Sequence, residues 1–240
     1  MSKYFFDLAN ICFHFFGILA LNKTCNSKHS IMIFNKEFKN AIQNLPGAEK
    51  DKLILRLLKR DLDLANHLYF ELVSTQSVED RREILQNNIT VATKTMYDHF
   101  HSLGYLLMDM RRLSGDITEH VKITKDKYGE ISFNLQMLNQ VISLNKLHIL
   151  NTKPQNTQTF CTYVNARAFK ILILINALHE DYRIEFKADL KKLGLLISEN
   201  SLLMRTAIYN GLDVKWLLEN EIPTNIVAIH KEIRSNGFLK

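Results

Sequence analysis

Glycine and proline are scarce in this chain. They contribute eight and three of its 240 residues, whereas an average composition would assign roughly 12% of a chain to the two together. Sandwiches, barrels and propellers need turn residues at their tight connections, so the scarcity excludes most β architectures of that kind. The sequence also lacks the glycine-rich loop that binds phosphate in P-loop and dinucleotide-binding folds.

Between these helix-breaking residues, apolar side chains recur at intervals of three and four, which is the period of an amphipathic helix. Long stripes of this kind predict helices over residues 48–73, 77–100, 103–121, 131–142 and 160–178. Shorter helices are predicted over residues 184–197, 199–210, 213–220 and 224–235. We expect most of the glycines and prolines to mark the helix boundaries. The expected fold is therefore all-α, with an antiparallel helical bundle followed by a second, C-terminal helical layer.

One segment divides the chain by its composition. Residues 151–159 hold only Asn, Thr, Lys, Pro and Gln, and such polar stretches are typical of linkers and loops between helices. We therefore expect an N-terminal helical bundle over residues 32–150, a linker or loop over 151–159 and a C-terminal helical subdomain over 160–240.

The first 31 residues contain an apolar stretch of their own, Leu8–Leu21. Its length suits the core of a signal peptide better than a membrane span. Asp7 precedes the stretch and Asn10 interrupts it, which argues against export. We favour an N-terminal extension or a loosely attached helix, then a signal peptide, then a membrane anchor. A further alternative is that the protein starts at Met32.

Charge and cysteine content exclude several classes of protein. The 31 Lys and Arg residues exceed the 25 Asp and Glu residues by only six, and there is no basic tail of the kind that binds nucleic acid. The three cysteines, Cys12, Cys25 and Cys161, form no C-x-x-C pair. This pattern argues against a disulfide framework or a zinc site and favours the cytoplasm. We expect Cys161 to be a buried packing residue.

Carboxylates provide the one plausible set of catalytic groups. Glu79, Asp80 and Glu83 lie within about one helical turn, and Asp116 and Glu119 have the same three-residue spacing on a later predicted helix. If the two helices pack side by side, these oxygens could hold Mg²⁺ against the phosphates of a substrate. The five residues are the candidate metal ligands.

A structural role for the first acidic group is the favoured alternative. Ser77 and Asp80 have the spacing of a capping box, and acidic residues in a first turn complement the helix dipole without any catalytic role. Arg81 and Arg82 would also neutralise part of a metal site.

Nucleic-acid binding is a weaker alternative. Arg111–Arg112 and Lys191–Lys192 could contact phosphate together with Arg56, Lys59 and Arg60. Residues 183–211 also have a faint pattern of a short strand before two helices, as in ribbon-helix-helix DNA-binding units.

Residues 32–235 resemble a set of all-helical bacterial proteins. The similarity lies in the segments IFNKEFKNAI, EKDKLILRLLKRDLDLANHLYFELV, GYLLMDMRRLSGDITEHVKITKDKYGE and ARAFKILILINALHEDYRIEF. Some members are labelled deoxyuridine triphosphate nucleotidohydrolase, and the all-helical enzymes of that kind carry E-E-x-x-E and E-x-x-D motifs. The resemblance implies Mg²⁺-dependent hydrolysis at Glu79-Asp80-x-x-Glu83 and Asp116-x-x-Glu119, although the second position of the first motif differs and the second motif is reversed.

Taken together, these patterns favour a cytoplasmic helical scaffold or interaction module that binds a protein partner or a second copy of itself, without a cofactor and without a membrane span. The alternative is a Mg²⁺-dependent nucleoside triphosphate pyrophosphohydrolase that resembles a dUTPase. A helical nucleic-acid-binding protein is the third hypothesis.

Overall fold

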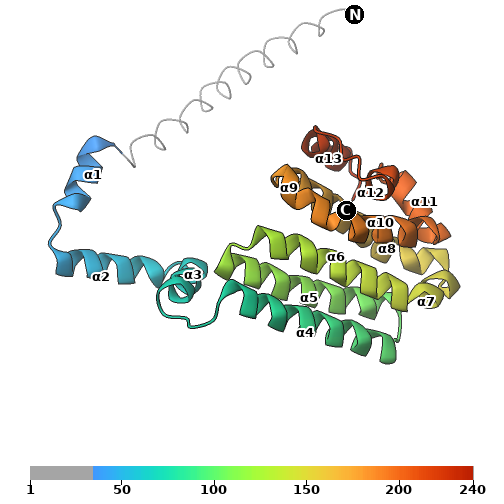
Figure 1. Cartoon of the computed structure of the whole chain (residues 1–240), viewed down its shortest axis with the longest axis horizontal. Coiled ribbons are helices and arrows are strands. Elements are labelled where there is room, and N and C mark those ends of the chain that lie inside the picture. Colours follow the sequence, from blue (N-terminus) through green and yellow to red (C-terminus); the bar gives the residue numbers. More distant parts are fainter. Residues whose placement is uncertain (1–34, 240) are drawn as a thin grey trace, which may run out of the picture. The chain divides into compact units, whose positions relative to one another are not determined.

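The computed structural model describes residues 35–239, and every regular element in that range is a helix (Figure 1). The expected all-α fold is thus confirmed. Within this range, no helix has both the length and the apolar character needed to cross a bilayer. The predictions for residues 1–31 lie outside the described residues. Contacts between residues divide the chain into two compact units, residues 1–61 and 62–240.

The described part of the first unit consists of two short helices, α1 (Lys36–Gln43) and α2 (Gly47–Leu58). The Asn35 side chain caps α1 by accepting a 2.7 Å hydrogen bond from the backbone N–H of Phe38. Neither helix contains a buried residue. Their apolar side chains therefore remain at the surface.

The prediction of one long helix over residues 48–73 is wrong. Helix α2 ends at Leu58, and three residues separate it from the next helix, α3 (Leu62–Leu72). Lys59, Arg60 and Asp61 interrupt the apolar pattern, and aspartate is a favoured residue immediately before a helix. The break is also the division between the two units.

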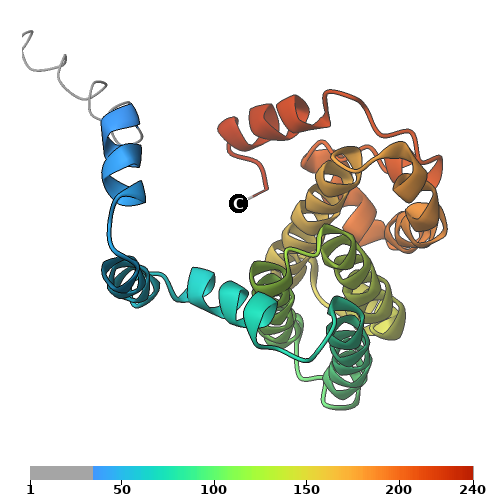
Figure 2. The same cartoon turned by 60° about the vertical axis from the view of Figure 1, so that its left-hand side comes forward.

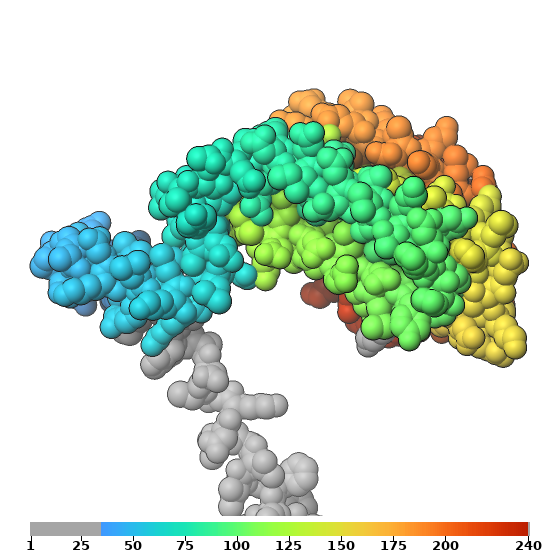
Figure 3. Space-filling model, turned by 90° about the horizontal axis from the view of Figure 1, so that it is seen from below, coloured from blue at the N-terminus to red at the C-terminus, as the bar shows by residue number. Residues whose placement is uncertain are grey.

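The second unit contains the packed core. Its first half holds α3, α4 (Val78–Asp98), α5 (Leu103–Thr124), α6 (Lys127–Leu144) and α7 (Lys146–Asn151). Its second half holds α8 (Pro154–Asn176), α9 (Glu180–Arg183), the 3₁₀ helix η1 (Ile184–Phe186), α10 (Lys187–Ser198), α11 (Ser201–Tyr209), α12 (Lys215–Leu218) and α13 (Ile226–Ser235). Helices α4, α5 and α6 pack together as the predicted bundle, with α3 against α5. Figure 3 shows the surfaces of α3, α4 and α5, coloured from cyan to green.

The second layer joins the bundle through α6 and α8 (Figure 2). Helix α6 contacts α4, α5, α8 and α10, while α8 contacts α5, α6, α11 and α13. The side chains of α6 at Ile131, Leu135, Leu138 and Ile142 are buried as predicted, and so are Phe133, Met137 and Val141 on other faces of the helix. Helix α6 is therefore surrounded by protein on almost all sides.

Two segments differ from their predicted conformation. Most of residues 151–159 are helical, because α7 ends at Asn151 and α8 begins at Pro154, a residue that suits the first turn of a helix. Residues 183–194 contain no strand and belong to η1, α10 and the end of α9. The ribbon-helix-helix pattern is therefore not present.

Most of the glycines and prolines in residues 35–239 lie at or near helix ends, as expected. Pro46 precedes α2, Pro154 starts α8, and Gly211 follows α11 with a φ angle of +71°. Gly115 and Gly194 instead lie inside helices. At Gly194 an added Cβ would come within 2.9 Å of Leu218, so the glycine permits the close approach of α10 and α12.

Candidate functional site

The predicted metal ligands are all exposed side chains on two helices. Glu79, Asp80 and Glu83 lie in the first turns of α4, and Asp116 and Glu119 lie on α5. Across residues 35–239, no group of three or more His, Cys, Asp or Glu side chains is placed so that it could hold a metal ion. The geometry therefore gives no support to a magnesium site at these carboxylates.

The capping role of Asp80 is confirmed. Its carboxylate accepts a 2.8 Å hydrogen bond from the backbone N–H of Ser77, and its own N–H donates to Ser77 Oγ at 3.0 Å. These hydrogen bonds lower the pKa of Asp80. Glu79, next to it, interacts with Arg82 at 3.3 Å.

The predicted basic surface is divided among separate elements. Arg56 lies on α2, with Lys59 and Arg60 just after it; Arg111 and Arg112 lie on α5, and Lys191 and Lys192 lie on α10. Nucleic-acid binding by these residues stays a prediction.

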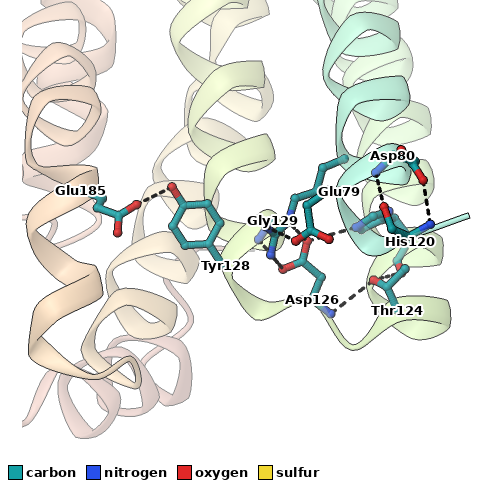
Figure 4. Close-up of polar contacts among 10 residues, drawn as sticks. Glu79, Asp80, His120, Thr124, Asp126, Tyr128, Gly129 and Glu185 are labelled. Atoms are coloured by element: carbon teal, nitrogen blue, oxygen red, sulfur yellow. Dashed lines mark hydrogen bonds and ion pairs between the residues drawn. The ribbon is translucent and has the colours of Figure 1, made fainter. Parts of the chain in front are cut away.

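A connected group of polar side chains is centred on Asp126, in the turn between α5 and α6 (Figure 4). Its side chain is only 2% exposed. Arg82 of α4 donates two hydrogen bonds to the carboxylate, from Nε at 2.5 Å and from Nη2 at 2.6 Å. His120 Nε2 lies 3.3 Å from the same carboxylate. We call Arg82, His120, Asp126 and Tyr128 the Asp126 cluster.

The position of Asp126 is determined by the backbone conformation of the turn and by its capping hydrogen bonds. Lys125 ends α5 in the left-handed conformation, with a φ angle of 58°, and reverses the chain. Asp126 then caps α6 by accepting a 2.8 Å hydrogen bond from the Gly129 N–H, and its own N–H donates to Thr124 Oγ at 3.3 Å. The position before a helix favours aspartate, so the turn itself fixes the carboxylate.

The cluster continues toward the second layer through Tyr128. The Arg82 guanidinium lies over the Tyr128 ring, 5.1 Å from its centroid. The Tyr128 hydroxyl donates a 2.8 Å hydrogen bond to Glu185 in η1. The contacts therefore connect three consecutive helices, α4, α5 and α6, with η1, which is distant in the sequence.

The surroundings of Arg82 and Asp126 favour the charged form of each side chain. Burial by itself would raise the pKa of Asp126, but the hydrogen bonds from Arg82, His120 and the Gly129 N–H outweigh it and hold this pKa far below its ordinary value. The hydrogen bond to Asp126 raises the pKa of Arg82. Burial and the hydrogen bond to Glu185 raise the pKa of Tyr128.

This arrangement is suited to structural stabilisation. The two oxygens of Asp126 already accept hydrogen bonds from Arg82 and Gly129, and the His120 side chain is only 5% exposed, with its ring edge-to-face against Phe133. A general base must reach a proton on its substrate. The enclosed Asp126 cluster instead holds four helical elements together.

Acidification is expected to remove the stabilisation that Asp126 provides. Because its folded-state pKa is depressed, the carboxylate stabilises the fold above the unfolded pKa of about 3.9 and loses this effect as the pH falls toward the folded-state pKa. Between about pH 5 and about pH 3, the free energy of unfolding should fall more steeply in the parent chain than in Asp126→Asn. Urea titrations at each pH measure this slope. Equal slopes for the parent and Asp126→Asn would contradict the expectation.

The sequence interpretation missed the Asp126 cluster. The position of Asp126 before an apolar helix, three residues from Gly129, is a capping signal that could have identified the turn. Nothing local could have paired it with Arg82, which is 44 residues away. Cys161 was predicted correctly: it is buried, and burial raises the pKa of its thiol to about 11.

Comparison with known proteins identifies no relative of this chain. The resemblance to the helical bacterial proteins, and the hydrolase activity that it implies, stay predictions from residue patterns. No protein-family model matches the chain, and comparisons with curated proteins and with solved structures return no match.

Proposed function

We propose that this chain is a helical interaction module whose helix α2, supported by α1, docks into an apolar groove with an acidic rim on a partner protein. The observation that carries the proposal is that neither helix has a buried residue. Helices of 8 and 12 residues are marginal in water without packing, because their formation depends on the burial of an apolar face. A partner that covers this face would supply the missing burial.

Helix α2 has an apolar face of the size that groove-binding helices use. Leu53, Ile54, Leu57 and Leu58 recur at the spacing of a single stripe. Ile54 and Leu57 are 50% and 52% exposed. Full burial of two such side chains would contribute about 1.5 to 3 kcal/mol each.

Charge indicates the chemistry of the groove. Residues 35–61 carry seven basic and four acidic side chains. The basic ones are Lys36, Lys39, Lys50, Lys52, Arg56, Lys59 and Arg60, and the acidic ones are Glu37, Glu49, Asp51 and Asp61. The excess of three positive charges favours an acidic rim on the partner and disfavours a second copy of the same basic segment. The interspersed carboxylates favour a protein groove over a uniformly anionic lipid surface.

Site-specific photo-crosslinking in cells that produce the full chain tests this proposal. A photoreactive residue at position 54 should give a discrete adduct with an acidic protein, whereas one at position 55, which lies outside the stripe and about 100° around α2 from position 54, should not. Leu55 is a matched control because it is apolar and 61% exposed. Adducts formed equally from both positions, adducts only with a second copy of this chain, or adducts only with lipid would overturn the proposal.

The introduction of negative charge into the stripe is expected to weaken binding of the purified partner strongly. Ile54→Glu combined with Leu57→Glu places two carboxylates in an apolar groove and should weaken the affinity by about a hundredfold or more. Leu55→Glu should keep the affinity within about threefold, since a single exposed substitution outside the interface has a small effect. Titrations of the full chain with the partner, at low and high salt, measure both effects. Equal losses in the two variants would contradict the proposed face.

A further inference from the structure

A pocket of about 530 Å³ lies between α3, α5 and α8. Its volume falls within the usual range for small-molecule sites, roughly 300 to 1,000 Å³. The residues that line it are mainly polar or charged, and they come from α5 and from the two helices of the second unit, α3 and α8, that each pack against α5. We propose that this pocket binds a small phosphate-bearing molecule.

Two arginines supply the positive charge. Arg111 of α5 and Arg167 of α8 both line the pocket, and both guanidinium groups lie near the Tyr163 ring, 5.9 Å and 5.2 Å from its centroid. In the described part of the chain, neither forms an ion pair with a carboxylate within 4.0 Å. Two guanidinium groups that line one pocket favour an oxyanion there, which would accept several charged hydrogen bonds.

A buried hydroxyl group is the second, independent observation. Ser114 lines the same pocket, is only 2% exposed, and its Oγ has no hydrogen-bond partner. Buried polar atoms are normally paired, so an orphaned hydroxyl at a pocket indicates a missing acceptor or donor. A phosphate oxygen would accept a hydrogen bond from it.

The acidic residues of the pocket restrict the rest of the ligand. Asp63 forms an ion pair with Lys122 at 2.7 Å, and Glu119 also lines the pocket. A carboxylate in this position would accept hydrogen bonds from hydroxyl or amino groups of the ligand. The chemistry therefore fits a sugar phosphate or a mononucleotide better than inorganic phosphate alone.

Calorimetric titration of the full chain with ribose 5-phosphate, adenosine 5′-monophosphate and inorganic phosphate tests the proposal, with ribose as the phosphate-free control. At least one organic phosphate should bind saturably at one site, and ribose should not. Arg111→Gln should weaken this binding about tenfold, as expected for the loss of a charged hydrogen bond. Arg112→Gln removes the same charge from the next exposed residue of α5, outside the pocket, and should leave the affinity unchanged.

A steric variant makes the test independent of charge. An added Cβ at Gly115, which lines the pocket, would meet no atom within 4 Å, so Gly115→Leu can occupy the pocket without disturbing the core. It should abolish binding while circular dichroism stays unchanged. The proposal would be overturned by no saturable binding of either organic phosphate up to about 10 mM, by equal losses in Arg111→Gln and Arg112→Gln, or by full affinity in Gly115→Leu.

Discussion

Arg82→Leu is expected to lower the free energy of unfolding by about 3 to 5 kcal/mol. The substitution removes both hydrogen bonds from the guanidinium to Asp126 and leaves a carboxylate that is 2% exposed without its cation. The loss should be visible as a lower midpoint of urea unfolding with an unchanged slope. Arg112→Leu, at an exposed position of α5, is the matched control and should change stability by less than about 0.5 kcal/mol.

A double variant distinguishes a lost charge partner from lost packing. Asp126→Asn removes the buried negative charge and retains a side-chain oxygen that can cap the Gly129 N–H. If the unpaired charge is the main cost of Arg82→Leu, then Arg82→Leu combined with Asp126→Asn should be more stable than Arg82→Leu alone. A double variant that is less stable than both single variants would contradict this explanation.

Gly129→Ala is expected to destabilise the fold by about 3 kcal/mol, although alanine is normally the better helix former. A Cβ at this position would lie 2.1 Å from Asp126 Oδ2, 2.8 Å from Asp126 Cγ and 3.0 Å from Phe133 Cε2. Asp126 cannot move away without weakening its hydrogen bonds to Arg82. The steric conflict therefore acts on the whole Asp126 cluster.

Gly115→Ala is the matched control for this prediction. Gly115 also lies in a helix, but an added Cβ there would meet no atom within 4 Å. The substitution should raise the free energy of unfolding by about 0.5 to 1 kcal/mol, because it restricts the unfolded chain and favours the helix. Thermal and urea unfolding of the two variants should thus show shifts of opposite sign. A stabilising Gly129→Ala would show that the position tolerates a side chain.

Local periodicity was sufficient to predict most of the helical core. On α5, Leu106, Met110, Leu113 and Ile117 are buried, as the stripe over residues 103–121 predicts. The prediction failed over residues 48–73, where an apolar stripe also occurs. An apolar stripe predicts which face of a helix could be buried, but it does not predict whether another element covers that face. Ile54 and Leu57 remain half exposed because no helix in the described part of the chain buries them.

For the candidate sites too, the sequence predicts contacts between neighbouring residues but not contacts between separate helices. The capping box at Ser77 and Asp80 depends on two residues three positions apart, so sequence spacing predicts it. The Asp126 cluster and the pocket with Arg111 and Arg167 depend on helices that meet only in the folded chain. Their residues carry ordinary surface-type side chains, and only packing makes Asp126 buried.

The position of α6 has a consequence for how the chain folds. A helix that is enclosed by α4, α5, α8 and α10 cannot complete its own burial until both layers are present. Residues 127–144 therefore couple the two halves into one cooperative folding unit, in which neither half reaches its native packing first. For this part of the chain, the burial of α6 is therefore complete only when α8 and α10 are also in place.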